Sequence, residues 1–366
     1  MAWHKNLHKW LHSYITLAMR SALIKKTIPK HIMFCVADHY EPFAGKVQVN
    51  RALDRVASWQ DVLPVIHENC KDSTGKGYRH SFFYPVDEYD KQVVEQVAGL
   101  CQSGCGELEI HLHHDNDSSE NLRKTLLYYK ELFSSRHSGL STEKKTGLVK
   151  YGFIHGNWAL DNSRPDGCWC GVNDELTILQ QTGCYADFTM PSAPDITQTS
   201  TINSIYYAID DPNAPKSHNR GFPASVGKEN AGLLLVQGPL TLNWSARKKG
   251  LLPAIENGEL GYGRPPTADR FQLWLQQNIH VESKGDWLFI KLHTHGAPEK
   301  NADVLLGDEM SSFLLGLADM CESLKCHLHY VTARELYNIV KAAEAGESGI
   351  PDDFRNYLLH SNSWKS

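Results

Sequence analysis

The feature that most constrains the fold is a strand pattern followed by a helix pattern, which recurs along the chain. Segments such as IMFCVA and GLLLVQG are almost continuously apolar, as in strands of a sheet that is buried on both faces. Helix patterns lie between them, for example where Leu53, Val56, Trp59 and Leu63 recur at helical spacing. Strands that alternate with helices favour parallel pairing. Seven or eight such units predict an α/β fold, a complete or irregular (β/α) barrel in a single domain.

Three segments are expected along the chain. Residues 31–345 form the barrel domain that carries catalysis, and residues 346–366 form a C-terminal tail. Residues 1–30 form an N-terminal amphipathic helical segment, because apolar residues from Trp3 to Tyr14 recur at helical spacing among lysines and histidines. Two interpretations of this segment remain open. We favour a helix docked on the core or on a protein partner, and the alternative is a helix that lies on a membrane surface.

The composition is that of an ordinary globular chain, with 41% hydrophobic and 22% charged residues. The formal net charge of −5 gives no electrostatic reason to expect a nucleic-acid partner. No apolar run approaches the roughly 20 residues that cross a bilayer, and no secretory signal pattern is present. We therefore expect a cytoplasmic protein, peripheral to the inner face of the membrane if its N-terminal helix binds lipid. Nine cysteines, an odd number, indicate reduced thiols rather than a disulfide framework.

The segment GELEIHLHHDND contains a strand with two chemically different faces. Side chains alternate along a strand, so Glu109, His111 and His113 share one face, and Leu108 and Ile110 lie on the other. The apolar face suits packing under helices. The histidine face must then point into the barrel, where a polar group without a partner costs about 1–3 kcal/mol.

Three other predicted strands also end in polar side chains. In a barrel the carboxyl ends of the strands converge on one mouth, where active sites of this architecture are built. We therefore expect the groups at these ends to meet. They are Asp38 and His39 in IMFCVADHYEP, His111 and His113 in GELEIHLHH, His155 and Asn157 in YGFIHGNW, and His293 and His295 in WLFIKLHTH.

These group types indicate metal chemistry. Imidazole and carboxylate together suit Zn²⁺ or a similar divalent ion, and a metal that activates water needs about three protein ligands and an open position. The chain contains neither a G-x-S-x-G nucleophile elbow nor a G-x-x-x-x-G-K-[ST] phosphate loop. The pattern therefore favours metal-dependent hydrolysis over a serine nucleophile or a nucleotide-binding loop.

Substrate contacts are expected near the same strand ends. His155 and Asn157 close the fourth strand. Trp158 beside them either stacks on a sugar ring or belongs to the core. Arg164 and Asp187 either bind substrate or pair with other charges.

The order of the motifs resembles that of the NodB-type polysaccharide deacetylases, carbohydrate esterase family 4 and its relatives. VADHYEP is similar to the first motif, an Asp-Asp pair, with Asp38 in the place of the base and His39 in the place of the metal-binding aspartate. EIHLHHDND matches the second motif, E-I-x-x-H, through His113, and Asp117 stands where a second histidine is expected. IKLHTHG resembles the final Leu-x-His motif. The resemblance spans roughly residues 31–296.

The resemblance implies a distorted (β/α) barrel of seven or eight strands, a divalent metal and the removal of acetyl groups from sugars. The implied metal is Zn²⁺, with Mn²⁺, Co²⁺ and Ni²⁺ as alternatives. Asp38 is implied as the general base, and His295 or His293 as the acid that protonates the leaving amine. The implied metal ligands are His39, His113 and Asp117, with His111 as a substitute for any of them. The substrate contacts expected from the residues themselves are His155, Asn157, Trp158, Arg164 and Asp187.

The sequence thus predicts a metal-dependent hydrolase of amide bonds, an N-deacetylase acting on a sugar or polysaccharide precursor. Two alternatives remain: a metal amidohydrolase acting on another small amide, and a non-catalytic barrel with a structural metal. Solvent access discriminates between a hydrolase and a barrel with a structural metal, because hydrolysis needs an open coordination position and a structural metal is closed by four protein ligands.

Overall fold

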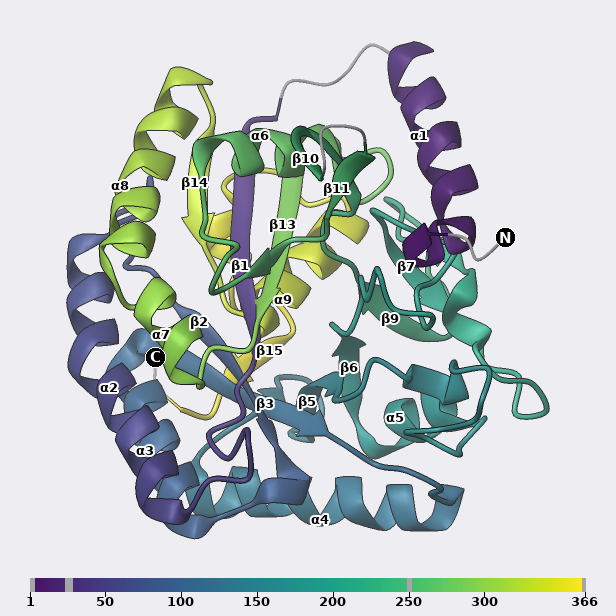
Figure 1. Ribbon diagram of the computed structural model, residues 1–366, viewed down its shortest axis with the longest axis vertical. Coiled ribbons are helices and arrows are strands. Elements are labelled where there is room, and N and C mark those ends of the chain that lie inside the picture. The colour runs from purple at the N-terminus through teal and green to yellow at the C-terminus, as the bar shows by residue number, and fades with distance from the viewer. Residues whose placement is uncertain (1–3, 24–28, 249–251, 364–366) are drawn as a thin grey trace.

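A mostly parallel sheet forms the centre of the computed structural model (Figure 1). The structure describes residues 4–23, 29–248 and 252–363. The central strands, which pair in parallel, are in spatial order β13 (Trp287–Thr294), β1 (His31–His39), β2 (His80–Pro85), β3 (Gly106–Leu112), β5 (Val149–His155), β6 (Cys184–Asp187) and β9 (Leu233–Val236).

Shorter strands extend this sheet. The parallel additions are β12 (Glu259–Leu260) beside β13 and β14 (His327–Tyr330) beside β1. The antiparallel additions are β7 (Ile205–Ala208) on β9, β8 (Phe222–Pro223) on β7, and β4 (Ser141–Glu143) between β5 and β15 (Leu359–Ser361). A separate hairpin consists of β10 (Thr241–Lys248) and β11 (Leu252–Glu256).

The strand pairings confirm the prediction of an α/β fold with parallel pairing in one domain. They do not show the predicted closure of a barrel. The pairing path runs from β12 to β8, and no pairing joins these two ends within the described part of the chain. The sheet is also wider than seven or eight strands, because short antiparallel strands lengthen it at β9 and β5.

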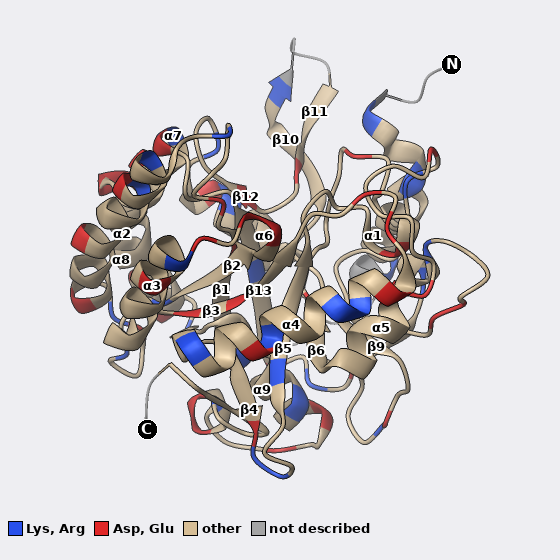
Figure 2. Cartoon of the chain, turned by 90° about the horizontal axis from the view of Figure 1, so that it is seen from below, with Lys and Arg blue, Asp and Glu red and all other residues tan. Residues whose placement is uncertain are grey.

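Helices cover the outer face of the sheet, and one helix fills its inner face. Figure 2 shows the strands surrounded by helices, with basic and acidic residues interspersed along α4. The inner helix is α9 (Ala333–Glu344), whose apolar side chains pack against alternate residues of β1 and β13. The outer helices are α2 (Val49–Asn69), α3 (Lys91–Leu100), α4 (Ser119–His137), α5 (Glu175–Thr182), α6 (Ala268–Gln276), α7 (Glu299–Leu305) and α8 (Asp308–Ser323).

The predicted alternation on β3 is confirmed. Leu108 and Ile110 belong to the core under the outer helices. Glu107, Glu109 and His111 are buried on the other face. The strand therefore separates a packing face from a polar face, as its sequence indicates.

A buried ion pair joins this polar face to α9 and to the C-terminal segment. Nε of Arg334 donates to Oε1 of Glu107 at 2.8 Å, and the hydroxyl of Thr332 donates to Oε2 at 2.6 Å. Nη1 of Arg334 also donates to the carbonyl oxygens of Arg355 at 2.9 Å and Leu359 at 3.0 Å. Arg334 is only 1% exposed. These hydrogen bonds hold the segment that was expected as a C-terminal tail against the sheet, up to and including β15.

The N-terminal helix α1 (Leu11–Leu23) docks on the body of the protein. Trp10, which precedes it, is 1% exposed and packs in a small core with Leu240 and Ile255. This contact supports the interpretation of a docked helix, and Trp3 lies outside the described residues. Among the described helices, none has both the length and the apolar character needed to cross a bilayer.

The buried ion pair generates a prediction about stability. Replacing Arg334→Met leaves the Glu107 carboxylate buried without a cation, so we expect the free energy of unfolding to fall by about 3–5 kcal/mol. Lys124→Met is the control, because its pair with Glu120 is exposed on α4 and should contribute at most about 1 kcal/mol. Urea unfolding of the three proteins measures both effects. Equal losses in the two variants would contradict the prediction.

Candidate functional site

The carboxyl ends of adjacent strands bring six ionisable side chains together. The strands β13, β1, β2 and β3 are neighbours, so the residues at or just after their ends lie at the same edge of the sheet. We call this group the histidine cluster. Its members are His39, Glu41, His111, His113, His293 and His295.

Glu41 lies between two histidines of this cluster. Its Oε1 is 3.2 Å from Nε2 of His111 and 3.4 Å from Nε2 of His113. Nδ1 of His113 lies 3.2 Å from Oδ2 of Asp87, which follows β2. The possible ligand atoms of Glu41, His111 and His113 lie within 4.8 Å of one another, and so do those of Glu41, His39 and His295. The cluster thus offers two overlapping sets of three donors that share Glu41.

Several buried nitrogens of the cluster have no hydrogen-bond partner. They are both ring nitrogens of His39, Nδ1 of His111 and Nδ1 of His293. The His39 ring lies 4.6 Å from that of His295 and 4.9 Å from that of His111, centroid to centroid. A buried polar atom without a partner costs about 1–3 kcal/mol. Unpartnered imidazole nitrogens beside a carboxylate fit a divalent metal ion, since these are ligands that Zn²⁺ and similar ions take.

The cluster has a buried floor and a rim that solvent reaches. His39, His111 and His293 are at most 2% exposed. The side chains of His113 and Glu41 are 26% and 16% exposed, and His295 is also partly exposed. An ion held by the rim residues therefore has a side that faces solvent. This is the arrangement expected of a catalytic metal rather than of a structural one.

The local electrostatics shift the pKa values of the cluster residues in different directions. Burial and the neighbouring His295 hold the pKa of His39 well below its ordinary value, so its ring is neutral. Burial alone would lower the pKa of His113, but the carboxylates of Asp87 and Glu41 outweigh it and raise this pKa to about 10. Burial alone would raise the pKa of Glu41, but hydrogen bonds to His111 and His113 hold it below its usual range. Metal binding here would therefore displace a proton from His113.

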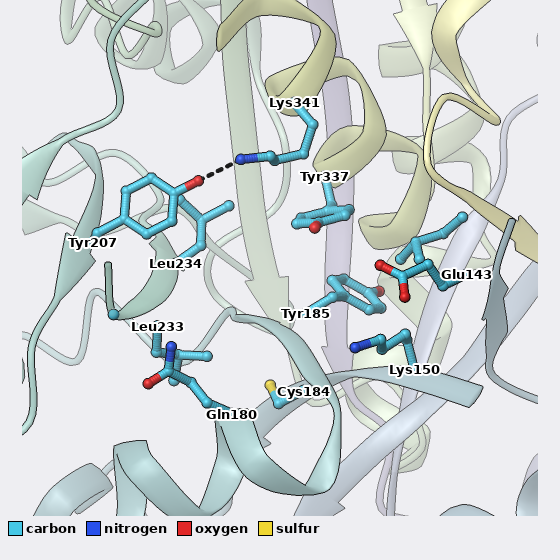
Figure 3. A pocket seen from close by; sticks show the side chains of 12 residues that line it. Glu143, Lys150, Gln180, Cys184, Tyr185, Tyr207, Leu233, Leu234, Tyr337 and Lys341 are labelled. Atoms are coloured by element: carbon cyan, nitrogen blue, oxygen red, sulfur yellow. Dashed lines mark hydrogen bonds between the residues drawn. The ribbon is translucent and has the colours of Figure 1, made fainter. Parts of the chain in front are cut away.

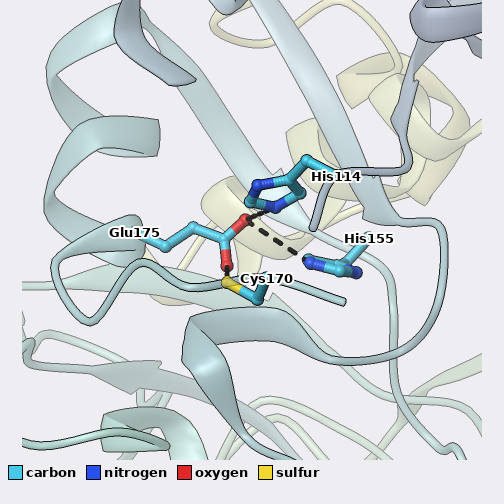
Figure 4. Close-up of side chains that lie close together, drawn as sticks. All are labelled: His114, His155, Cys170 and Glu175. Carbon is cyan, nitrogen blue, oxygen red and sulfur yellow. Dashed lines mark hydrogen bonds and ion pairs between the residues drawn. The ribbon is translucent and has the colours of Figure 1, made fainter. Parts of the chain in front are cut away.

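A second group of possible ligands lies nearby and is more deeply buried. It consists of His114, His155, Cys170 and Glu175 (Figure 4), and we call it the buried cluster. His155 ends β5, and Glu175 opens α5. The ring of His114 lies 4.8 Å from that of His155. The sequence patterns predicted His155 as a substrate contact, and the structure places it against His114 in this buried cluster.

Asp38 does not reach the histidine cluster. Alternation along β1 directs its side chain to the outer face, with the residues that pack under the helices, and directs His39 to the inner face. Oδ1 of Asp38 accepts a hydrogen bond from the backbone N–H of Gly296 at 2.7 Å, and Oδ2 lies 2.9 Å from Nε2 of His80. This position differs from that required of a base in direct contact with the reacting water.

Asp117 also lies outside the histidine cluster. Its Oδ2 is 3.1 Å from Nδ1 of His114, and its Oδ1 accepts hydrogen bonds from Ser118 and Asn121 at the start of α4. Of the two candidates for the last ligand position, the structure thus brings His111 to His113 and Glu41, and it turns Asp117 toward His114.

The expected substrate contacts are dispersed. Trp158 lies at the histidine cluster, with its ring 6.1 Å from that of His39 and 5.9 Å from that of His295. The backbone N–H of Asn157 donates to Nδ1 of His155.

Two charged residues that were expected to bind substrate have partners within the protein. Arg164 pairs with Asp166 and lies 4.1 Å over the Trp169 ring. Asp187 is 1% exposed and accepts hydrogen bonds from the N–H and hydroxyl of Thr189. Neither residue lies in the histidine cluster.

The sequence patterns gave no site role to Asp87, which lies beside the histidine cluster, or to His114, Cys170 and Glu175 of the buried cluster. They suggested for Glu41 only that it shapes the first loop or orients a ligand. Asp87 follows the second strand directly, in the segment YPVD, and an acid at a strand end is the signal that could have found it. Cys170 and Glu175 lie in an irregular segment and at a helix start, where spacing alone gives no signal.

A pocket of about 160 Å³ lies at the opposite end of the sheet (Figure 3). Cys184 and Leu233, which line it, are the first residues of β6 and β9. Lys341 from α9 donates to the hydroxyl of Tyr207 at 2.7 Å in its wall. Because active sites of parallel α/β folds form at the carboxyl ends of strands, we do not assign the candidate site to this pocket.

Sequence comparisons found no relative of this chain. No protein-family profile matches it, and no curated protein matches it in sequence. A solved structure described as a "putative polysaccharide deacetylase" from Mycobacterium smegmatis aligns with a TM-score of 0.43 and 11% sequence identity. That alignment covers 89% of this chain and 96% of the other.

The burial of Asp187 generates a prediction about pH dependence. Burial raises the pKa of Asp187 from 3.8 to about 7, so folding takes up a proton between these two values. The stability that this proton gives is present at low pH and is lost as pH rises through 7. Relative to Asp187→Asn, the wild type should lose about 2 kcal/mol of unfolding free energy between pH 5 and pH 7.

Denaturant unfolding at pH 5, 6 and 7 measures this difference. Asp166→Asn is the control, because Arg164 lowers the pKa of Asp166 to about 2 and the carboxyl is ionised throughout this range. A constant difference between wild type and Asp187→Asn across the range would contradict the assignment.

Proposed function

We propose that this protein is a metal-dependent hydrolase of amide bonds, and that it removes N-acetyl groups from a sugar or a polysaccharide precursor. The observation that carries the proposal is the set formed by Glu41, His111 and His113. Three donors converge there beside the unpartnered nitrogens of His39, and two of them, Glu41 and His113, lie at the rim that solvent reaches. The N-acetyl substrate class is inferred from the motif resemblance, and the hydrolytic chemistry from the geometry.

The residues of the set would bind the metal, and neighbouring residues would support them. Glu41, His111 and His113 would hold the ion, and Asp87 would fix the His113 ring by accepting a hydrogen bond from Nδ1. When bound, a divalent ion such as Zn²⁺ activates water and polarises a carbonyl oxygen. His39, neutral and buried, borders the site and is an alternative donor together with His295.

His295 is the better candidate for the acid that protonates the leaving amine. It is partly exposed and stacks on His39, and His293 is buried in the floor of the cluster. A leaving group that arrives from the rim therefore reaches His295 before His293. The ring of Trp158 beside His295 supplies an apolar wall for a sugar ring, as is common in ligand sites.

Asp38 would act as a positioning residue in this scheme. Its carboxylate binds the N–H of Gly296, the residue that follows His295, and so holds the turn that presents the proposed acid. Its second oxygen lies 2.9 Å from Nε2 of His80, so each carboxylate oxygen already has a partner outside the histidine cluster. This role follows from the buried position of Asp38 on the outer face of β1.

The substrate and the cellular context extend the same proposal. The expected cytoplasmic location suggests a nucleotide-linked or lipid-linked sugar, or another biosynthetic intermediate, rather than a finished polymer. A contact of α1 with the membrane or with a protein partner would bring the enzyme to such a substrate.

Metal content and acetate release test the proposal together. We expect the wild-type protein to bind a divalent ion and to release acetate from at least one member of a panel of N-acetyl sugars. His113→Ala should lose one equivalent of metal relative to the wild type, because one of three ligands is gone, and turnover should fall at least about 10²-fold. His360→Ala, an exposed histidine on β15, is the matched control and should keep both properties.

Two results would overturn the proposal. Full metal retention in His113→Ala would remove this residue from the ligand set. Metal-loaded wild-type protein that releases no acetate from any sugar in the panel would remove the deacetylase assignment.

Asp38→Asn separates positioning from base catalysis. We expect metal content to be unchanged and turnover to fall about 10-fold, with the acidic limb of the pH–rate profile kept, because a positioning residue does not transfer the proton. Disappearance of the acidic limb in this variant would restore Asp38 as the general base.

A further inference from the structure

The buried cluster contains four different side chains that converge on one point. The possible ligand atoms of His114, His155, Cys170 and Glu175 lie within 4.8 Å of one another. His155, Cys170 and Glu175 are fully buried, and the His114 side chain is only 6% exposed. Figure 4 shows the two rings, the thiol and the carboxylate directed toward one another from separate segments. No member of the group belongs to the histidine cluster.

His114 is held in the orientation of a metal ligand. Its Nδ1 lies 3.1 Å from Oδ2 of Asp117, and Asp117 is itself fixed by the side-chain amide of Asn121 at 2.7 Å. Nε2 of His114 therefore points inward, 3.3 Å from Oε1 of Glu175. A carboxylate that accepts the hydrogen bond from the outer nitrogen of an imidazole is the usual outer partner of a metal-binding histidine.

His155 gives a second and independent indication of a metal site. Its Nε2 is buried without a hydrogen-bond partner, and the nearest acceptor, Oε1 of Glu175, lies 4.0 Å away. A ligand bound at Nε2 would satisfy this nitrogen. Binding there places the ring proton on Nδ1, so the long 3.3 Å contact from the N–H of Asn157 would be given up.

Burial and the Glu175 carboxylate raise the pKa of Cys170 to about 11, so its thiol keeps the proton until a metal displaces it. The backbone N–H groups of Asn162 and Val172 point at its sulfur, at 3.3 and 3.5 Å. The thiol of Cys170 donates to Oε2 of Glu175 at 3.4 Å, and the same oxygen accepts a hydrogen bond from the N–H of Asp161. Two donors directed at one sulfur compensate the negative charge that a metal-bound cysteine carries.

We propose that His114, His155, Cys170 and Glu175 form a second metal site, closed by four protein ligands, which takes Zn²⁺. Two neutral imidazoles, one thiolate and one carboxylate together neutralise the charge of a divalent ion, and mixed nitrogen, sulfur and oxygen ligands suit Zn²⁺. Four-coordinate Zn²⁺ with bonds of about 2.0–2.3 Å holds its ligand atoms roughly 3.3–3.8 Å apart. The ligand atoms, which lie within 4.8 Å of one another, thus need to approach by about 1.5 Å at most.

The role of this site is structural, because four protein ligands leave no open position for water or substrate. The bound metal would connect the segment 156–175 to the ends of β3 and β5. That segment carries Trp158, which borders the histidine cluster. The second site therefore supports one wall of the candidate active site without sharing a ligand with it.

Cobalt substitution tests this assignment in the full-length protein. Co²⁺ bound to a thiolate gives a charge-transfer absorption band, and the histidine cluster contains no cysteine that could produce one. After removal of metal with a chelator, we expect the wild type to develop this band on addition of one equivalent of Co²⁺ and to lose it on addition of Zn²⁺.

Two cysteines of the same segment provide a matched pair of variants. Cys170→Ser should abolish the band, and Cys168→Ser should keep it, because Cys168 is exposed and lies outside the cluster. Asp117→Asn should keep the band but weaken Zn²⁺ binding about 10–100-fold, as expected when the outer partner of a ligand is changed. Glu41→Gln should keep the band even where it abolishes hydrolysis, so failure of the proposed function and failure of this site are distinguishable.

Two outcomes would overturn the second site. One is a folded wild type that shows no thiolate-to-cobalt band, which would mean that His114 and Glu175 form an ion pair without metal. The other is a band of unchanged intensity in Cys170→Ser. The wild-type titration decides the matter even if Cys170→Ser fails to fold.

Discussion

The alignment of parallel strands around β1 is the constraint on which the candidate site depends. Ala37 is paired with His293 in the register of β1 and β13, so His39 and His295 come level two residues later, where their rings stack. On the other side β2 connects β1 to β3, and Pro85 pairs with His111. Parallel pairing brings strand ends that are distant in sequence to one edge of the sheet. A slip of one residue would turn these side chains to the helix-packed face.

The two clusters use similar residue types for different purposes because their burial differs. The histidine cluster has unpartnered nitrogens on its floor and a carboxylate and imidazoles at a solvent-reached rim, which suits an ion with an open side. The buried cluster has four donors that enclose one point away from solvent. The catalytic metal and the structural metal are interpretations of the sequence that exclude each other at a single site. Two separate metal sites would allow both.

Much of the fold could be predicted from the sequence. The alternation of Leu108 and Ile110 with Glu109 and His111 is a local property of one strand, and the structure confirms which face packs under the helices. The same periodicity could have excluded Asp38 from the site, since it shares a face with the apolar residues of β1. Motif resemblance outweighed periodicity at that position, and the structure follows the periodicity.

The sequence by itself determined the parallel α/β fold, the polar strand ends and the presence of metal-ligating residue types, because hydrophobic periodicity and residue chemistry are local. Only the tertiary structure decided which groups meet. Asp87, Cys170 and Glu175 reach their clusters through loops and a helix start, whose paths depend on packing elsewhere. Asp117 and His113 are four residues apart, yet they turn to different clusters. The reason is physical: beyond a strand end no periodicity directs a side chain, and its neighbours in space do.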